Sequence, residues 1–486
     1  MNRPLEALRD TRPTSAQAWS EGGRPPQPDE AESLLANSLP AYLIALDAVA
    51  RDQGREPELA VSRHELLAHA ERALGREGRS FVEAVVDQSE ALSSNEPPAP
   101  DSYRRSIDAL NQVLEEQNLG FYLDAIVLER YDRRQVLFAS FAVDQVNHFR
   151  TNEGASVRAL RLRRIDRLAF RRSLLGFTRR QVRDALVLEE RIEQFLASQL
   201  LPSLAEGAAM PLGDDFFGER ANAIGARAGA VAREEAVALS DAAALTLGRA
   251  LASRKARIEA WQERFAGRLA LRTPERIDID IDTYAALEAR VHRSEWREFR
   301  RAQETLEDDD VRAAYRTLEA AFSGSVERHE VQHRIDYASD TLERLPPELE
   351  ALTGALRIEG FDNTRAQRSL AELSAYLAEL GASPALSRTR LSLLSRHLYD
   401  QSGWGRAECY ATLVIFDLLA RHLELDHGPF VVRRRIDREA IADIHLRVLQ
   451  RTGAELSAAA NAAWSEAFGR PVATVLDANA PRAAPR

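Results

Sequence analysis

The feature that most constrains the fold is a pentapeptide in the second half of the chain, His329-Glu330-Val331-Gln332-His333. Residues four positions apart lie about 40° apart around an α-helix, so both histidines can approach one point if this segment is helical. Gly324 is expected to break the chain before the motif, and Ser325 to cap a new helix. The spacing therefore predicts a helix that starts just before the motif and carries both histidines on one face.

The chain around the motif continues this helical pattern. From about Glu219 to Arg268 it is rich in alanine, and most of the remainder to about Val475 shows helical periodicity. The exception is the segment 276–284, in which isoleucine and aspartate alternate strictly. Alternation with a period of two predicts a half-buried strand at 276–284.

The first half of the chain differs in character. Three short runs rich in Val, Leu, Ile and Phe, at 121–130, 135–143 and 156–165, predict antiparallel strands. We therefore expect an α+β protein that is predominantly helical, with a small antiparallel β-containing domain before a mainly α domain. Pro-rich and Gly-rich stretches set the expected divisions: a flexible tail at 1–35, a helical segment and linker at 36–102, the small α+β domain at 103–215, the mainly helical domain at 216–475 and a disordered tail at 476–486.

Composition excludes several classes of protein. The net charge of -10 argues against nucleic-acid binding, which usually requires a basic surface. A single cysteine, Cys409, excludes a disulfide framework and a cysteine-based zinc finger. No run approaches the roughly 18 apolar residues that span a bilayer. The N-terminus as written lacks an export signal, which predicts a cytoplasmic location, or a periplasmic or secreted one if a signal peptide was trimmed.

The residue types in the pentapeptide point to metal chemistry. Zinc accepts neutral imidazole nitrogen, and a catalytic zinc site holds three protein ligands and a water. His329 and His333 are thus candidate ligands, and Glu330 is a candidate general base that takes a proton from the water. The alternative is a pair of histidines that form hydrogen bonds in a core.

This HExxH motif resembles the zincin superfamily of zinc metallopeptidases, directly over residues 325–340. Metzincins place glycine and a third ligand where this chain has Asp336 and Ser339, so that branch does not fit. The inverted HxxEH motif is absent. The pattern resembles gluzincins, in which a glutamate on a later helix completes the zinc site. The resemblance implies a zincin-like fold for 216–475 and hydrolysis of peptide bonds.

Two glutamates compete to be the third ligand. Glu372 lies on a predicted helix with a leucine stripe that Gly381 ends, at a distance from the motif that is ordinary for gluzincin-like sites. Glu408 lies on an almost wholly apolar helix, where it would need a buried partner. Glu372 is favoured, and Tyr376, one turn further on, is a candidate for stabilising an oxyanion.

Other residues near the motif are candidates for supporting roles. Asp336 would orient a ligand histidine through its second N–H, or pair with an arginine on the helix surface. Tyr337, His397 and Tyr410 are further candidate proton donors. In zincins an edge strand above the motif helix commonly binds the substrate backbone, and 276–284 is either that strand or an ordinary one.

The sequence thus predicts a zinc metallopeptidase of gluzincin-like type that acts on a peptide or protein. The expected zinc ligands are His329, His333 and Glu372, with Glu330 and Tyr376 as catalytic groups. One alternative is a non-catalytic scaffold with a structural or vestigial zinc site. Another is a bacterial toxin-like effector that uses the same peptidase site on one host protein.

Overall fold

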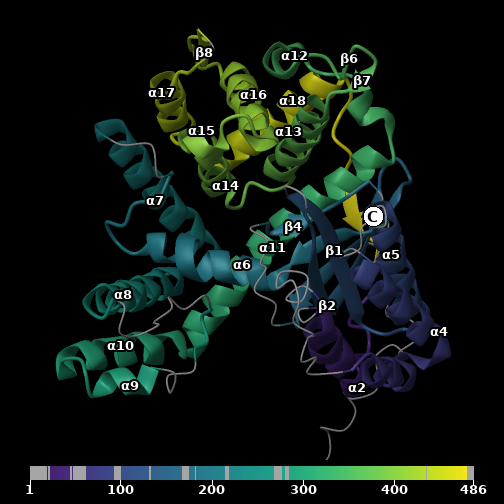
Figure 1. The fold of residues 1–486 in the computed structure, drawn as a ribbon. Helices are drawn as coiled ribbons and strands as arrows, with labels where there is room; N and C mark the ends of the chain where they lie inside the picture. The colour runs from purple at the N-terminus through teal and green to yellow at the C-terminus, as the bar shows by residue number, and fades with distance from the viewer. Residues whose placement is uncertain are drawn as a thin grey trace, which may run out of the picture. The chain divides into compact units, whose positions relative to one another are not determined.

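The computed structural model describes residues 19, 22–43, 46, 62–91, 100–130, 133–166, 174–180, 182–213, 218–266, 276–279, 284–433 and 435–478. Within them the chain is mixed α+β and predominantly helical, as predicted (Figure 1). It forms two compact units, described separately below. Unit 1 comprises Met1–Leu174, Leu186–Glu190 and Val475–Arg486, and unit 2 comprises Leu175–Ala185 and Arg191–Thr474.

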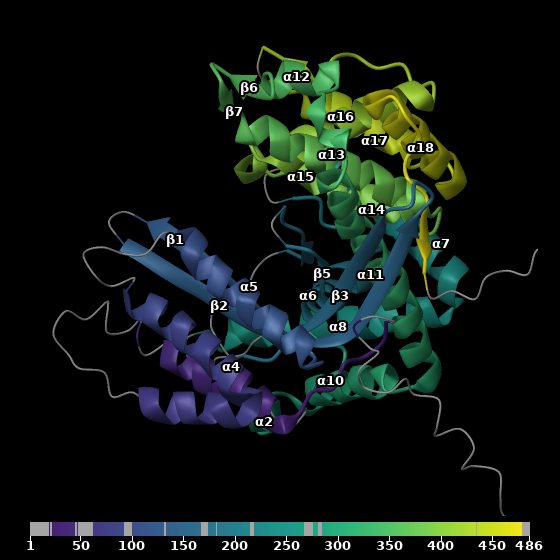
Figure 2. The ribbon, with the colours of Figure 1, turned by 90° about the vertical axis from the view of Figure 1, so that its right-hand side faces the viewer.

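Unit 1 is an antiparallel sheet with helices on one face. Its strands are β1 (Phe121–Arg130), β2 (Arg133–Thr151), β3 (Ser156–Arg164), β5 (Ala185–Leu188, its first residue in unit 2) and β10 (Val475–Asp477). The long strand β2 pairs with β1, with β3 and with β10. Its helical elements are α2 (Asp29–Ser33), η2 (Leu34–Ser38), α4 (Arg63–Ala91) and α5 (Pro100–Glu116). Figure 2 shows α5 alongside the β1–β2 hairpin.

The core of unit 1 follows from two periodicities. Tyr103, Ile107, Leu110 and Leu114 recur at helical spacing on α5 and are buried. Alternate residues of β1, such as Phe121 and Leu123, are buried in the same cluster, which also includes residues of α4. The helical segment before residue 102 and the strands after it therefore share one core, whereas the sequence analysis divided them.

Unit 2 is built mainly from helices. In chain order they are α6 (Glu189–Phe195, beginning in unit 1), η3 (Leu196–Leu200), η4 (Leu201–Leu204), α7 (Glu219–Ser240), α8 (Ala243–Arg264), α9 (Ala285–Glu288), α10 (Arg293–Leu306), α11 (Asp309–Tyr337), η6 (Asp340–Glu343), α12 (Pro347–Thr353), α13 (Thr364–Ala382), α14 (Ser387–Leu394), α15 (Arg396–Tyr399), η7 (Gln401–Gly403), α16 (Ala407–His422), α17 (Arg438–Val448) and α18 (Gly453–Phe468). Its short strands are β4 (Gly176–Phe177), β6 (Arg357–Ile358), β7 (Phe361–Asp362), β8 (Val431–Val432) and β9 (Arg435–Ile436). Helix α13 packs against α11, α16 and α18 around the largest apolar cluster (Figure 1).

The predicted helix break before the pentapeptide is wrong. Helix α11 runs without interruption from Asp309 to Tyr337, and its cap is Asp308, whose carboxylate accepts from the backbone N–H groups of Asp310 and Val311. Ser325 lies inside this helix, and its hydroxyl donates to Glu379 on α13. A glycine within a helix costs about 1 kcal/mol, which the packing of a long helix outweighs.

The predicted strand at 276–284 is not seen in the described part of that segment. Residues 276–278 form bends, residue 279 has no regular structure, and residues 280–283 lie outside the described residues. The buried Arg254 of α8 donates to the carbonyl oxygens of Arg276 and Ile277, at 2.5 and 2.7 Å. A guanidinium therefore satisfies backbone acceptors that a strand would offer to a neighbouring strand.

Two further features concern the C-terminal part of the chain. Residues 476 and 477, which were predicted to begin a disordered tail, belong to strand β10, which pairs with β2. Residues 479–486 lie outside the described residues. No helix in the described part of the chain has the length and apolarity needed to cross a membrane.

Candidate metal centre

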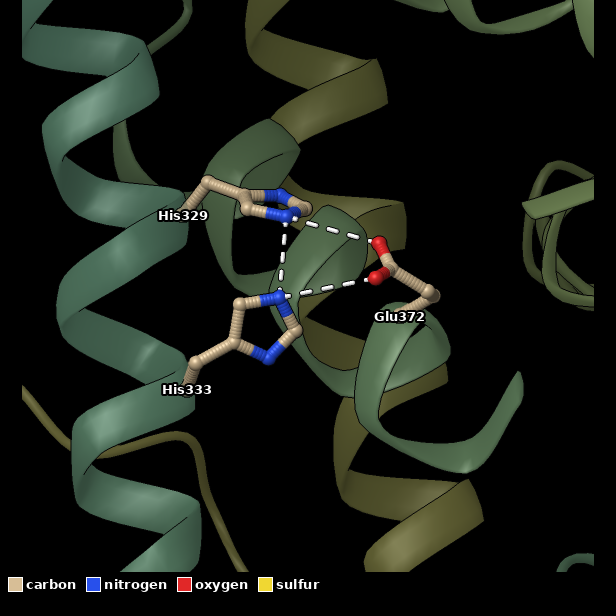
Figure 3. Close-up of side chains that lie close together, drawn as sticks. All are labelled: His329, His333 and Glu372. Carbon is tan, nitrogen blue, oxygen red and sulfur yellow. Dashed lines mark hydrogen bonds and ion pairs between the residues drawn. The ribbon is translucent and has the colours of Figure 1, made fainter. Parts of the chain in front are cut away.

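The structure brings together the three predicted metal ligands. His329 and His333 extend from one face of α11, and Glu372 faces them from α13 (Figure 3). The two Nε2 atoms are 3.1 Å apart, and the carboxylate oxygens of Glu372 lie 3.5 Å from Nε2 of His329 and 3.7 Å from Nε2 of His333. One donor atom from each residue lies within 4.8 Å of the others, an arrangement that could hold a metal ion.

Small and polar residues let α11 and α13 approach at this point. Ala375 and Ser374 are fully buried on α13, between turns that carry the leucine stripe. Ser374 receives hydrogen bonds from Gln332 of α11 (3.4 Å) and from Trp464 of α18 (3.1 Å). Each buried leucine of the stripe contributes about 1.5–3 kcal/mol, so helix packing fixes the distance between Glu372 and the histidines.

Gly381 does not end α13 in the expected way, since the helix continues to Ala382. Its role is close approach. A Cβ at this position would lie 2.4 Å from Oδ1 of Asn461 on α18. The Gly381 carbonyl accepts from Asn461 and Ser457 of the same helix, at 3.0 and 2.8 Å. The glycine thus allows α18 to pack closely against the end of α13.

A second carboxylate on α13 lies behind His329. Oε2 of Glu379 is 3.2 Å from Nδ1 of His329, although the approach is not in line enough for a well-formed hydrogen bond. Because a carboxylate is an acceptor, it favours the tautomer in which Nδ1 carries the proton and Nε2 presents its lone pair to the centre. The carboxylate is held in turn by the Ser325 hydroxyl, which itself accepts from Arg390 at 2.9 Å.

The two histidines differ electrostatically. Burial lowers the pKa of His329, but the carboxylates of Glu372 and Glu379 outweigh this effect and raise its pKa well above the ordinary value. Burial lowers the pKa of His333 to about 4. His329 is therefore the stronger base of the two, and an N–H at its Nε2 can donate to Nε2 of His333.

Glu330 is buried next to this centre, and a threonine far away in sequence binds it. Thr178, just after β4, places its hydroxyl 2.8 Å from Oε2 of Glu330 and 3.2 Å from the Glu330 carbonyl oxygen. Burial raises the pKa of Glu330 to about 7, against the opposing effects of His329 and Thr178. A carboxyl group with a pKa near neutrality is well suited to general acid–base catalysis.

Aromatic side chains surround the histidines. The ring of Tyr376 lies 4.5 Å from that of His329, and the ring of Tyr337 stacks on His333 at 6.0 Å. Burial and the charge of Glu372 raise the pKa of Tyr376 well above the ordinary value, so its phenol keeps its proton. His397 lies 6.5 Å from Tyr376, centroid to centroid. Tyr410 instead packs against Trp404 at 6.2 Å.

Asp336 takes neither of its two expected roles. Its side chain is buried, so it is not an aspartate on the helix surface, and it accepts from Gln332 one turn earlier at 2.8 Å. Burial raises its pKa to about 6. The Asp336 carboxylate is held by Gln332 and by Ser374 of α13, and the carboxylate beside a ligand histidine is that of Glu379.

Of the two competing glutamates, only Glu372 joins the histidines among the described residues. Glu408 lies half-buried in the first turn of α16, where the helix N-terminus favours a negative charge. The N-terminus of α16 therefore takes the place of the buried partner that was predicted for this glutamate.

Two residues at the centre, Glu379 and Thr178, were not among the predicted site residues. Glu379 could have been found, because it lies two turns after Glu372 on the same helix and so shares its face. Thr178 gave no such signal, since it is 152 positions from Glu330 and follows a two-residue strand. Comparison of the chain with protein-family models, with curated proteins and with solved structures gives no match.

Proposed function

We propose that this protein is a zinc-dependent hydrolase of zincin type, gluzincin-like, that cleaves peptide bonds in a peptide or protein substrate. The observation that carries the proposal is the group of His329, His333 and Glu372 with Glu330 beside it. Two imidazole nitrogens and one carboxylate are a donor set that suits zinc. When bound, zinc would act as a Lewis acid that polarises a carbonyl and acidifies a water.

The residues of the chain have distinct roles in this proposal. His329, His333 and Glu372 hold the metal, and Glu379 keeps the Nε2 lone pair of His329 directed at it. The carboxylate of Glu330 takes the proton of the attacking water and passes it to the leaving amine. Tyr376, whose phenol keeps its proton beside His329, donates a hydrogen bond to the developing oxyanion.

The number of protein ligands supports catalysis over a purely structural metal site. Structural zinc sites usually close their coordination with a fourth protein ligand. In the part of the chain that the structure describes, the group has three members. A fourth coordination position is therefore left for water or substrate.

The test combines metal content with cleavage. Zinc is measured by mass spectrometry on the wild type, Glu372→Ala, Glu408→Ala and Glu330→Gln, and each protein is incubated with a peptide library whose products are identified by mass. We expect one zinc per chain in the wild type, Glu408→Ala and Glu330→Gln, and loss of zinc in Glu372→Ala. Cleavage should fall by roughly a thousandfold or more in Glu330→Gln despite full metal content. A wild type that takes up no zinc when it is supplied would contradict the proposal.

A further inference from the structure

Thr178 contacts the Glu330 carboxylate from outside the helix that carries the pentapeptide. It follows strand β4, which lies beside α11 in unit 2 (Figure 1). Its hydroxyl oxygen is 2.8 Å from Oε2 of Glu330 and 3.2 Å from the carbonyl oxygen of the same residue. Both contacts go to one residue, so among the described residues this hydroxyl bridges the side chain and the backbone of Glu330.

We propose that Thr178 is a positioning residue that holds one oxygen of Glu330 so that the other faces the metal centre. This inference rests on the proposed function. The carboxylate is planar, and the hydroxyl fixes Oε2 relative to the Glu330 backbone. An anchored Oε2 therefore limits the positions that Oε1 can take. A glutamate has three side-chain torsions, so an unanchored base would lose part of its population to other orientations.

The contact between the hydroxyl and Oε2 does not involve Oε1, the oxygen that would take the proton. The hydroxyl donates its single hydrogen to Oε2. A proton on Oε1 leaves this hydrogen bond in place. The carboxyl group therefore keeps a hydrogen-bond partner before and after it takes a proton, without a change of rotamer.

The test uses acetohydroxamic acid, a small probe that needs no known substrate. A hydroxamate chelates zinc through its two oxygens and passes its hydroxyl proton to a carboxylate beside the metal. Its affinity for the zinc-loaded full chain, measured by calorimetry, thus reports on the orientation of Glu330 without turnover. The variants are Thr178→Val, which keeps the shape and removes the hydroxyl, Thr178→Ser, which keeps the hydroxyl, and each of these combined with Glu330→Ala.

We expect Thr178→Val to bind the probe roughly fivefold more weakly at unchanged zinc content, the size of one net hydrogen bond, and Thr178→Ser to restore binding. In the Glu330→Ala background the two Thr178 variants should bind the probe equally, because the residue acts through the glutamate. If Thr178→Val weakened probe binding as much in the Glu330→Ala background as in the wild type, the inference would be overturned, and Thr178 would have a general structural role.

The remaining outcomes separate the inference from the proposed function. If Glu330→Ala weakens binding and Thr178→Val does not, the positioning role is refuted and the proposed hydrolase stands. If the wild type binds zinc but Glu330→Ala does not change the affinity for the probe, the proposed base does not lie at the metal. The inference about Thr178 and the proposed function are then both refuted. If the wild type binds no zinc, the proposed function itself fails.

Discussion

Unit 2 buries histidines in two different settings, and the contrast separates a candidate site from a core residue. His445 of α17 is fully buried, with the Ser392 hydroxyl 3.3 Å from Nε2 and the Tyr399 hydroxyl 3.2 Å from Nδ1. Both ring nitrogens therefore have neutral partners that donate or accept as needed. Such an imidazole satisfies its own polar groups and requires nothing more.

His329 and His333 are arranged in the opposite way. Their Nε2 atoms face each other at 3.1 Å, and the nearest other charges are the carboxylates of Glu372 and Glu379. Nδ1 of His333 has no hydrogen-bond partner among the described residues. Two imidazole lone pairs beside two carboxylates form a stable group only with a cation or a proton between them. Burial alone does not distinguish a ligand from a core histidine, whereas the partners of both nitrogens do.

The largest expected effect breaks this comparison directly. Replacing His329 by Ala should abolish stoichiometric zinc binding, a loss of at least a thousandfold in affinity, because one of three protein ligands is removed. Replacing the fully buried His445 by Gln should leave the zinc content unchanged. Equilibrium dialysis with zinc measures both. Equal zinc loss in the two variants would mean that general unfolding, and not ligation, explains the result.

The second prediction concerns acid stability and follows from His445. Burial lowers its pKa from 6.5 to about 3, so the unfolded chain takes up the proton first as the pH falls. This histidine therefore contributes stability that is present above pH 6.5 and decreases by about 1.4 kcal/mol per pH unit between 6.5 and 3. His445→Gln should flatten that part of the profile. Urea unfolding followed by tryptophan fluorescence measures it, since four of the five tryptophans lie in unit 2. An unchanged slope would show that other groups govern the acid limb.

The third prediction uses the metal as a ligand of the folded state. Zinc at about a hundred times its dissociation constant should stabilise the protein by roughly 2.7 kcal/mol, because it binds the native site and not the unfolded chain. The midpoint of thermal unfolding, measured with zinc and after chelation, should rise in the wild type. The shift should disappear in a His329→Ala/His333→Ala double variant. A shift of the same size in that variant would place the stabilising zinc elsewhere.

The smallest expected effect tests the carboxylate behind the ligand. Glu379→Gln keeps the size of the side chain but removes the charge that favours a proton on Nδ1 of His329. Zinc affinity should fall about tenfold, as is usual for partners of metal-ligating histidines. A competition titration with a chromophoric chelator measures the change. The matched control is Glu350→Gln on α12, an exposed glutamate that should leave the affinity unchanged.

Much of the fold could be predicted because local patterns carry it. The leucine stripe of α13 is a periodic signal that burial confirms, and the apolar run at 121–130 forms strand β1 as predicted. The errors arose where tertiary contacts override local preference. The predicted break at Gly324 is wrong because the packing of α11 outweighs the low helix propensity of glycine. The carbonyl oxygens of Arg276 and Ile277 accept from the buried Arg254 and not from a neighbouring strand. The division between helices and sheet at 102 also could not be predicted, because a shared core depends on side chains distant in sequence.

The sequence by itself determined the motif and the donor atoms that it offers. Two histidines at helical spacing with an intervening glutamate bring the same donor atoms to one face of any helix, since 3.6 residues complete each turn. Only the tertiary structure decided that Glu372 and not Glu408 faces these histidines, that Glu379 lies behind one of them, and that Thr178 contacts Glu330. Those contacts depend on how α11, α13 and the segment after β4 pack together, and helix packing is set by side chains from all three segments rather than by any local pattern.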